Sequence, residues 1–353
     1  MARIFITGGA GFIGSRLARA LRGEHAVTVY DNYLPQVHAG NEAPADWLDG
    51  VTIVRADVRD ADALKQAIAA ADPEIVYHLA AETGTGQSFD EPVRYNGVNI
   101  MGTANLIEAV RAHAPNLKRI VLAGSRSVYG EGACVDADGR PAVAVERKPE
   151  HMAAGDFEPR DAAGRKLTPV PTSSLNCPVE PASIDASTKL MQEYLLKQAF
   201  WGTPVQIGIL RLQNVYGPGQ SLNNPYTGVI SIFRRQIEEG KTLNIFEDGV
   251  ITRDFVFVDD VVAAFKAIGL VAECPRDIVD IGSGEATTIL HMAKTLLSLM
   301  GHDPERVRIT GDFRAGDIRY AVADISMARE KLGWQPDYDL DRGLRAFLAW
   351  SAA

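Results

Sequence analysis

Cysteine is scarce in this chain of 353 residues. The three cysteines, Cys134, Cys177 and Cys274, lie far apart, and none belongs to a CxxC or Cys/His pattern. This spacing excludes a disulfide framework and a structural zinc site, and it is typical of a protein kept in a reducing compartment. A chain of this length can bury a large apolar core without such cross-links. We therefore expect neither disulfides nor a bound metal.

Long apolar runs and an excess of basic residues are also missing. No apolar run reaches the roughly 18 residues needed to span a bilayer, and the first residues, MARIFITGG, lead straight into a folded pattern without a targeting signal. The net charge of −9 is spread along the chain, which disfavours nucleic acid as a partner. These features predict a cytoplasmic protein that binds any anionic ligand through local basic groups and backbone amides.

Short apolar runs alternate with stretches of helical periodicity along the first part of the chain. Residues 3–7 form an apolar run that ends at glycines, and apolar residues then recur at helical spacing up to Gly23. The further apolar runs span 26–30, 51–54, 74–79, 118–123 and 205–212, and the helical stretches span 60–71, 98–113 and 185–200. This alternation predicts an α/β fold with a doubly wound parallel sheet.

The pattern loosens after about residue 213, which suggests two domains. We expect a cofactor-binding domain over 1–212, interrupted by an irregular insertion at 132–178, and a smaller α/β substrate domain over 213–353. The segment 253–270 is expected to pack back on the first domain. Helices of the second domain are predicted at 228–239, 258–272, 288–300 and 340–350.

A glycine pattern follows the first predicted strand. Gly8, Gly11 and Gly14 allow a tight turn, close approach of a pyrophosphate, and packing of helix on strand. Asp31 ends the second strand, where a carboxylate accepts hydrogen bonds from the adenosine ribose and repels a 2′-phosphate, so NAD is favoured over NADP. Asp57, after the third strand, is placed to meet the adenine, although a solvated turn residue is the alternative.

These glycines form part of a longer series of motifs. The others are HLAA at 78–81, SRSVYG at 125–130, RLQNVYGP at 211–218, RDFVFVDD at 253–260 and IGSG at 281–284. The series covers nearly the whole chain and resembles the extended short-chain dehydrogenase/reductase family, in particular its nucleotide-sugar epimerases and dehydratases. The stretches AETGTGQS at 81–88, NNPYTGV at 223–229, IFEDG at 245–249 and GDIR at 316–319 look most like dTDP-L-rhamnose 4-epimerases and related nucleotide-sugar 4-epimerases.

The resemblance implies a Rossmann domain that binds NAD. Besides the glycines and the two aspartates, the residues implied in NAD binding are Phe12, Ile13, Asn32, Val58, Leu79, Ala80, Ala81, Asn99 and Lys189. It also implies a reaction in which NAD removes hydrogen from C4 of a bound sugar, the 4-keto sugar rotates, and hydrogen returns to the opposite face.

The family's catalytic residues are a Ser or Thr, a Tyr, and a Lys four residues beyond that Tyr. Ser125 and Lys189 match the first and last, but the tyrosine position holds Asp185. A phenol starts from a pKa near 10 and a carboxylate from one near 4, and we expect Lys189, one helical turn away, to lower the pKa of Asp185 further. On this expectation Asp185 is a permanent, weak base of short reach.

Three explanations stay open at this stage. Asp185 impairs catalysis, or another group replaces the phenol, or Asp185 acts as a base through water. Glu82, beside Thr83 at the predicted carboxyl edge of the sheet, is the main candidate for a replacement, although a solvated or sugar-contacting acid is the alternative. Tyr129 is expected to serve packing. Arg126 and Ser127 lack the acidic pair of a sugar dehydratase, which disfavours 4,6-dehydration.

The resemblance also implies a nucleotide-sugar site. Arg253 and Arg319 correspond to pyrophosphate- and nucleoside-binding positions, and Asp317 is expected either to bind the nucleoside ribose or to pair with Arg319. The remaining residues implied in substrate binding are Thr83, Asn214, Tyr226, Thr227, Val229 and Phe246.

The leading hypothesis is therefore an NAD-dependent nucleotide-sugar 4-epimerase acting on a pyrimidine nucleoside diphosphate sugar. A nucleotide-sugar ketoreductase, or a protein that binds NAD and a nucleotide sugar with little turnover, is the alternative. We also expect a homodimer built from the helices at 98–113 and 185–200, with Ile107, Val110, Leu190 and Leu195 on the contact faces.

Overall fold

A seven-stranded parallel sheet forms the centre of the molecule. The computed structural model describes residues 1–38, 45–222, 228–314 and 316–351. The strands follow the order β14-β9-β5-β4-β1-β2-β3, and every pairing between neighbours is parallel. Their bounds are β1 Arg3–Thr7, β2 Ala26–Asp31, β3 Thr52–Arg55, β4 Ile75–His78, β5 Arg119–Ser125, β9 Gln206–Leu212 and β14 Val279–Ile281.

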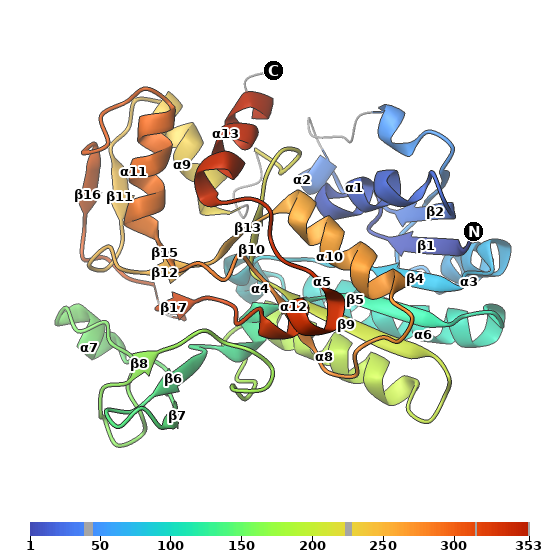
Figure 1. The fold of residues 1–353 in the computed structure, drawn as a ribbon, viewed down its shortest axis with the longest axis horizontal. Coiled ribbons are helices and arrows are strands. Elements are labelled where there is room, and N and C mark those ends of the chain that lie inside the picture. The colour runs from blue at the N-terminus through green and yellow to red at the C-terminus, as the bar shows by residue number, and fades with distance from the viewer. Residues whose placement is uncertain (39–44, 223–227, 315, 352–353) are drawn as a thin grey trace.

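Helices cover both faces of this sheet (Figure 1). One face packs against α1 (Phe12–Leu21), α10 (Val258–Leu270) and α12 (Ser326–Leu332), and the other packs against α3 (Ala61–Ala71), α6 (Gly102–His113) and α8 (Ile184–Ala199). A π-helical segment, Asn96–Met101, leads into α6. The predicted doubly wound α/β fold is thus confirmed, because each apolar run became a strand and each amphipathic stretch a covering helix.

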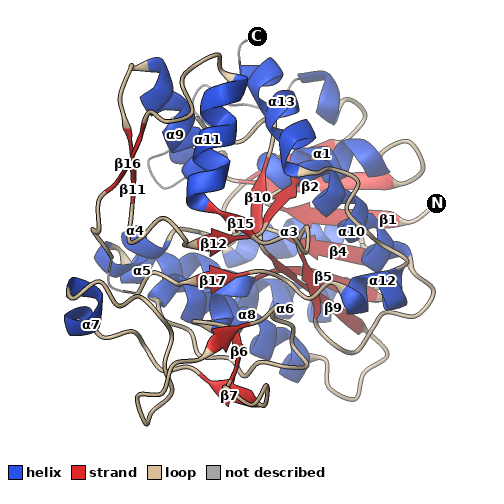
Figure 2. Cartoon of the chain, turned by 60° about the vertical axis from the view of Figure 1, so that its left-hand side comes forward, coloured by secondary structure: helices blue, strands red, loops and turns tan. Residues whose placement is uncertain are grey.

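A second group of elements lies beyond the carboxyl ends of the strands (Figures 1 and 2). It contains three small sheets, β10 with β13, β11 with β16, and β15-β12-β17, around a core of its own. Its elements are β10 Asn214–Tyr216, α9 Val229–Glu238, β11 Leu243–Ile245, β12 Thr252–Arg253, β13 Phe255–Phe257, β15 Thr287–Thr288, α11 Ile289–Leu299, β16 Val307–Ile309, β17 Tyr320–Ala321 and α13 Leu340–Ser351.

The central sheet draws on both halves of the chain. Strand β14 pairs with β9, although it follows the predicted boundary at residue 213, and α10 packs on the same face as α1, which agrees with the expectation for segment 253–270. The predicted boundary therefore separates most of the second group of elements from the first part of the chain, but the central sheet contains strands from both sides of the boundary. A strand of three residues, such as β14, is too short to be recognised from periodicity.

The insertion at 132–178 has structure of its own. We expected an irregular stretch, but β6 (Ala133–Val135) pairs antiparallel with both β7 (Pro141–Val143) and β8 (Thr168–Pro169), and α7 (Pro149–Ala153) follows β7. Short elements thus lie within the stretch that we expected to be irregular, and loops and turns connect them. These strands have two or three residues each, and Cys134 pairs with Pro169 far along the chain, so local periodicity carries no sign of the sheet.

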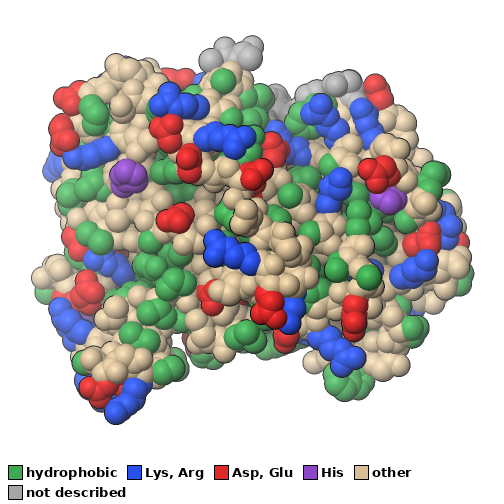
Figure 3. All heavy atoms as spheres, in the orientation of Figure 1, with side chains coloured by type: hydrophobic (Ala, Val, Ile, Leu, Met, Phe, Trp, Pro, Cys, Tyr) green, Lys and Arg blue, Asp and Glu red, His purple; other side chains and the backbone are tan. Residues whose placement is uncertain are grey.

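On the face that Figure 3 shows, basic and acidic side chains are interspersed and form no patch of a single sign of charge. Among the described helices, none is long and apolar enough to cross a membrane. Three short helices complete the fold: α2 Pro35–His38, α4 Thr85–Asp90 and α5 Pro92–Tyr95.

Candidate functional site

The turn between β1 and α1 is built for close approach of a ligand. Gly8 has a φ of +67°, and a Cβ on it would lie 2.7 Å from the backbone nitrogen of Ala80, so a side chain is excluded there. A Cβ on Gly14 would overlap the carbonyl oxygen of Gly8. Gly11 caps α1 and has no side chain to occupy the amides of the first turn. These amides are the donors that a pyrophosphate needs.

A cavity of about 130 Å³ opens beside this turn at the carboxyl edge of the sheet. Its lining includes most of the predicted NAD-binding residues: Gly8, Gly11, Asp31, Asn32, Asp57, Val58, Leu79, Ala80 and Ala81. The predicted contacts Gly14, Phe12, Ile13, Asn99 and Lys189 lie outside this lining. Gly14 contributes through the packing just described, and Phe12 and Ile13 pack against the core of the second group.

Asp31 is held firmly at the wall of this cavity. Its carboxylate accepts hydrogen bonds from the backbone nitrogens of Ala10 (3.0 Å) and Tyr33 (2.8 Å), and Nε2 of His38 lies 3.4 Å from Oδ1. The carboxylate thus connects the glycine turn to the loop after β2. The contribution of His38 was not predicted, because the short helix α2 that carries it shows no motif.

Asp57 lies on the other side of the cavity and is ionised at neutral pH. Burial acts to raise its pKa, but hydrogen bonds from Arg59 and Asn32 outweigh burial and lower this pKa to about 2. Arg59 donates from Nε at 2.9 Å and from Nη2 at 2.8 Å, and Nδ2 of Asn32 donates at 2.9 Å. Asp57 is therefore an ionised acceptor held in place by Arg59 and Asn32.

Ser125 ends β5 at the same edge of the sheet. Its Oγ accepts a hydrogen bond from the backbone nitrogen of Ser127 at 3.1 Å and lies 2.8 Å from the hydroxyl of Ser127. Ser125 thereby caps a 3₁₀ turn over Arg126–Tyr129. Helix α8 packs on β5 and on this turn. The topology therefore brings Ser125 and the first turn of α8 to one edge.

Asp185 lies in that first turn and is 8% exposed. The backbone nitrogen of Gly84 donates to its carboxylate, and Oδ1 has no hydrogen-bond partner among the described residues. Burial raises the pKa of Asp185 against the opposing effects of Lys189 and Gly84. Lys189 lowers this pKa, as expected, but the expected net result, a pKa below the usual value, is wrong, since desolvation of the carboxylate outweighs the attraction of the lysine.

Lys189 is also buried, one turn further along α8. Its Nζ donates to Oε1 of Gln192 at 2.6 Å. Burial lowers the pKa of Lys189 to about 8 although Asp185 and Glu193 act to raise it. Asp185 and Lys189 thus form a pair of buried groups whose pKa values are shifted toward each other.

Glu82 forms an ion pair that was not predicted. Its Oε2 lies 2.9 Å from Nη2 of Arg94, and its backbone nitrogen and oxygen bind the side chain of Asn99 at 2.8 and 3.0 Å. Asn99 also donates to Thr188 of α8 at 2.8 Å. Because Glu82 meets a cation instead of an apolar wall, the geometry disfavours it as the group that replaces the phenol.

Tyr129 serves packing, as expected. Its hydroxyl donates to both carboxylate oxygens of Asp280, at 2.8 and 3.0 Å, in the interior beneath the site. Burial, and next the charge of Asp280, raises the pKa of Tyr129 far above its usual value. This phenol therefore stays protonated and cannot substitute for the missing tyrosine.

Arg253 and Arg319 have different surroundings. Arg253 donates to Asp317 at 2.6 Å and to the carbonyl of Ile318 at 2.7 Å. Arg319 donates to three carboxylates, those of Glu247, Asp248 and Glu158. Asp317 thus pairs with Arg253 and not with Arg319. Three carboxylates around Arg319 would repel a phosphate, so the structure disfavours the predicted phosphate-binding role of this arginine.

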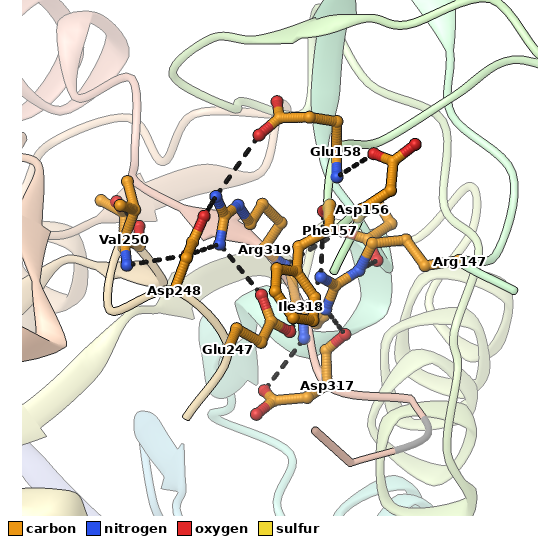
Figure 4. A network of polar contacts seen from close by, with 12 residues as sticks. Arg147, Asp156, Phe157, Glu158, Glu247, Asp248, Val250, Asp317, Ile318 and Arg319 are labelled. Carbon is orange, nitrogen blue, oxygen red and sulfur yellow. Dashed lines mark hydrogen bonds and ion pairs between the residues drawn. The ribbon is translucent and has the colours of Figure 1, made fainter. Parts of the chain in front are cut away.

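A buried polar network, which was not predicted, joins the insertion to the second group of elements (Figure 4). Arg147 of the insertion donates from Nη1 to Glu247 at 2.8 Å, from Nη2 to the carbonyl of Asp317 at 2.6 Å, and from Nε to Glu131 at 2.9 Å. Figure 4 shows Arg319 approaching the same Glu247 from the other side. Nothing in the local sequence marks Arg147, because its partners are distant along the chain.

The remaining predicted substrate residues are spread along the second group and the loop after β4. Asn214 of β10 and Val229 of α9 are half-buried, and Thr83 is exposed. Phe246 lies under the guanidinium of Arg314, which is 4.8 Å from the ring centre. Tyr226 and Thr227 lie outside the described residues.

A second cavity, of about 540 Å³, opens between the 3₁₀ turn, the insertion and the loop that leads into α8. Its walls are Tyr129–Ala133, Pro141–Arg147, Met152, Asn176–Pro178, Glu180–Ala182 and Gly316–Ile318. The volume lies in the range of sites for small molecules. Ala182, on its wall, shortly precedes Asp185 in the chain, so this cavity approaches the first turn of α8.

Comparisons with known proteins agree on one family. The model of the NAD dependent epimerase/dehydratase family matches residues 4–149 and 161–282. The chain is 41% identical to the dTDP-L-rhamnose 4-epimerase of Burkholderia thailandensis over 99% of its own length and 95% of the relative's. It is 33% identical to the UDP-glucose 4-epimerase of Mycolicibacterium smegmatis, over 97% and 96%. The structure superposes on the complex of Thermus thermophilus UDP-glucose 4-epimerase with NAD at a TM-score of 0.78, with 27% identity and 99% of both chains covered.

Proposed function

Because this chain belongs to the NAD dependent epimerase/dehydratase family, we propose that it is a nucleotide-sugar 4-epimerase whose proton carrier is Asp185. The observation that carries the proposal is the likeness to a dTDP-L-rhamnose 4-epimerase along 99% of the chain, combined with the buried Asp185 at the tyrosine position. The proposed substrate is a hexose or deoxyhexose linked to a pyrimidine nucleoside diphosphate.

The residues around the first cavity suit the adenosine and pyrophosphate part of NAD. Gly8 and Gly14 leave no room for side chains, the amides of the first turn of α1 are available to a pyrophosphate, and Asp31 and Asp57 stand at the adenosine side. When bound, NAD supplies the acceptor and donor of hydrogen at C4. Asp31 would meet the 2′-phosphate of NADP with like charge, which supports NAD as the preferred cofactor.

Three side chains of the site have proposed roles toward the sugar. Ser125, at the end of β5, orients the C4 hydroxyl through its Oγ. Asp185 accepts the proton of this hydroxyl and later returns it. A carboxylate whose pKa stays near 4 returns a proton poorly at neutral pH, whereas burial raises the pKa of Asp185 and makes the exchange easier. Lys189, one turn further along α8, stabilises the ionised form of Asp185.

The proposal is tested with NAD-loaded protein and a panel of uridine and thymidine diphosphate sugars, following inversion at C4 by NMR. We expect slow inversion of at least one sugar, loss of turnover in Asp185→Asn, and unchanged turnover in the control Ser187→Ala, which alters the exposed side of the same helix. If no sugar is inverted by the parent chain, the epimerase proposal is wrong.

A binding protein with little turnover is the second candidate. The observation that favours it is the short side chain of Asp185, which ends well before the position a phenol would reach. Tight binding of a nucleotide sugar in calorimetry, without any inversion at C4 over many hours, would favour this candidate over the enzyme.

We also propose a homodimer, but with different contact residues from those expected. Ile107 and Val110 are buried in the core of this chain, and Leu195 packs against the same core, so these three do not form a free face, whereas Leu190 is half-buried. The exposed apolar side chains are instead Val93, Met101, Met191 and Tyr194, on α5, the π-helical segment and α8, which contact one another. A cytoplasmic location stays a prediction.

A further inference from the structure

Arg126 is the exception among the five buried arginines of the described chain. Its Nη2 donates to the carbonyl of Gly130 at 3.0 Å, its Nε is enclosed without a hydrogen-bond partner among the described residues, and no described carboxylate pairs with it. The other four each donate several hydrogen bonds. Arg119 donates to three backbone carbonyls, Arg211 donates twice to Glu193, and Arg147 and Arg319 both pair with Glu247.

The carboxylate nearest to Arg126 in sequence is already engaged. Oε1 of Glu131 accepts from Nε of Arg147 at 2.9 Å, and Oε2 accepts from the backbone nitrogen of Arg319 at 3.1 Å. Glu131 therefore binds groups on the opposite wall of the larger cavity. A guanidinium enclosed without an ion-pair partner is unfavourable, because burial removes its hydration, and the charge of Glu131 acts to raise the pKa of Arg126 but does not outweigh burial.

The position of Arg126 is next to both the larger cavity and Ser125. Residues Tyr129–Gly132 line that cavity, and a Cβ on Gly132 would lie 3.9 Å from Nη2 of Arg126, so the guanidinium lies directly behind this wall. Arg253 adds a second positive charge nearby. Burial, followed by the charge of Arg253, lowers the pKa of Arg126 to about 10, so Arg126 is still a cation at neutral pH.

We propose that Arg126 is a substrate-recognition residue whose guanidinium binds an anionic group of the nucleotide sugar at the wall of the larger cavity. The inference rests on the proposed function for the class of ligand, and it adds the residue that selects it. The anion is either the diphosphate, which all these ligands share, or a carboxylate on the sugar, which only uronates carry. Both match the planar set of donors of a guanidinium.

The test is titration calorimetry on NAD-saturated protein with dTDP, UDP-glucose and UDP-glucuronate. Arg126→Gln removes the charge and keeps polar atoms. Arg140→Gln, on the exposed turn between β6 and β7, removes the same charge from the surface and controls for long-range electrostatics. We expect Arg126→Gln to weaken binding by roughly 10- to 100-fold, as for a hydrogen bond to a charged group, and Arg140→Gln to leave it unchanged.

The pattern across the ligands identifies the anion. A similar loss for all three assigns Arg126 to the diphosphate, and a loss confined to UDP-glucuronate assigns it to a sugar carboxylate. Equal affinities of parent and Arg126→Gln for all three overturn the inference while the proposed epimerase stands. If the parent binds none of them, both proposals are wrong.

A second variant covers the case in which Arg126→Gln does not fold. Arg126→Lys keeps a cation but lacks the planar set of donors, so we expect at least about threefold weaker binding with the thermal unfolding temperature preserved. Unchanged affinity of this variant for all three ligands also overturns the inference.

Discussion

The pKa of a single side chain decides how this site can work. Asp185 stands at the position that the resemblance assigns to a catalytic tyrosine, and from the sequence a carboxylate beside Lys189 is expected to stay ionised. Burial raises the pKa of Asp185 above its usual value, because the loss of hydration of the carboxylate outweighs the opposing effects of Lys189 and the Gly84 amide. The same effect lowers the pKa of Lys189 to about 8.

Restoring tyrosine at this position tests how far Asp185 limits the reaction. We expect Asp185→Tyr to raise C4 epimerase turnover by at least about tenfold, equivalent to roughly 1.4 kcal/mol of barrier. Ser125 and Lys189 are already at the same edge of the sheet, and a phenol reaches further than a carboxylate. Turnover is measured by NMR with the sugar that the parent inverts.

Equal turnover of parent and Asp185→Tyr would show that Asp185 is not limiting. The companion Glu82→Gln in the parent then separates the remaining cases. Loss of turnover would implicate Glu82, against the geometry of its ion pair with Arg94, and unchanged turnover would leave Asp185, acting through water, as the base.

Asp280 is a second buried carboxyl with a measurable consequence. Burial raises its pKa to about 7, although hydrogen bonds from Tyr129 and Ser174 oppose this. Since the unfolded value is near 4, the stability that Asp280 contributes is fully present below about pH 4 and is lost as the pH rises through about 7. Asp280→Asn cannot ionise. Its free energy of unfolding, relative to the parent, should therefore rise between about pH 4 and 7, by at most roughly 4 kcal/mol.

Urea unfolding of parent and Asp280→Asn from about pH 4.5 to about pH 8 measures this difference. Asp138→Asn, which changes an exposed carboxylate in the insertion, serves as the control and should show no such trend. Parallel pH profiles of parent and Asp280→Asn would contradict the raised pKa.

At the scale of elements, the insertion is held by buried charge. The small sheet of β6, β7 and β8 is too short to be stable alone, and Arg147 ties it to Glu247 of the second group and to the carbonyl of Asp317. Because Gly316–Ile318 and the insertion form opposite parts of one cavity wall, this tie also sets the shape of the proposed substrate site.

Removing Arg147 should release the insertion. Arg147→Met leaves Glu131 without its ion pair and Glu247 with Arg319 as its remaining partner, so we expect a loss of about 3 kcal/mol in the free energy of unfolding. Limited proteolysis should then cut within 132–178 faster than in the parent. The control Arg140→Met, whose ion pair is exposed, should change stability by less than about 0.5 kcal/mol. Equal cleavage rates of parent and Arg147→Met would refute this role.

At the scale of the whole molecule, the proposed dimer depends on the apolar face of α5, the π-helical segment and α8. An isologous contact brings each exposed residue of this face close to its copy. Met191→Glu should therefore give a monomer in light scattering at micromolar concentration, where the parent gives twice the mass of one chain. Ile309→Glu alters an exposed apolar side chain of β16 and should leave the mass unchanged. A monomeric parent would refute the dimer.

The amino-acid sequence by itself determined the parts of this protein that depend on local order along the chain. The period of apolar residues predicts the strands and helices that alternate in the first part of the chain. The glycine turn with Asp31 predicts the cofactor site because steric freedom and a carboxylate after the strand are local properties. The resemblance to the family, carried by motifs in the sequence, also implies that Asp185 occupies the position of a catalytic tyrosine.

Only the tertiary structure decided what each charged group faces. Strand β14 joins the sheet from the second half of the chain, Glu82 meets Arg94, Asp317 pairs with Arg253, and Arg126 is enclosed without an anion among the described residues. Desolvation and pairing depend on which residues fold against each other. Partners that lie many residues apart leave no pattern in the sequence, so the pKa of Asp185 and the environment of Arg126 become apparent only when the chain is folded.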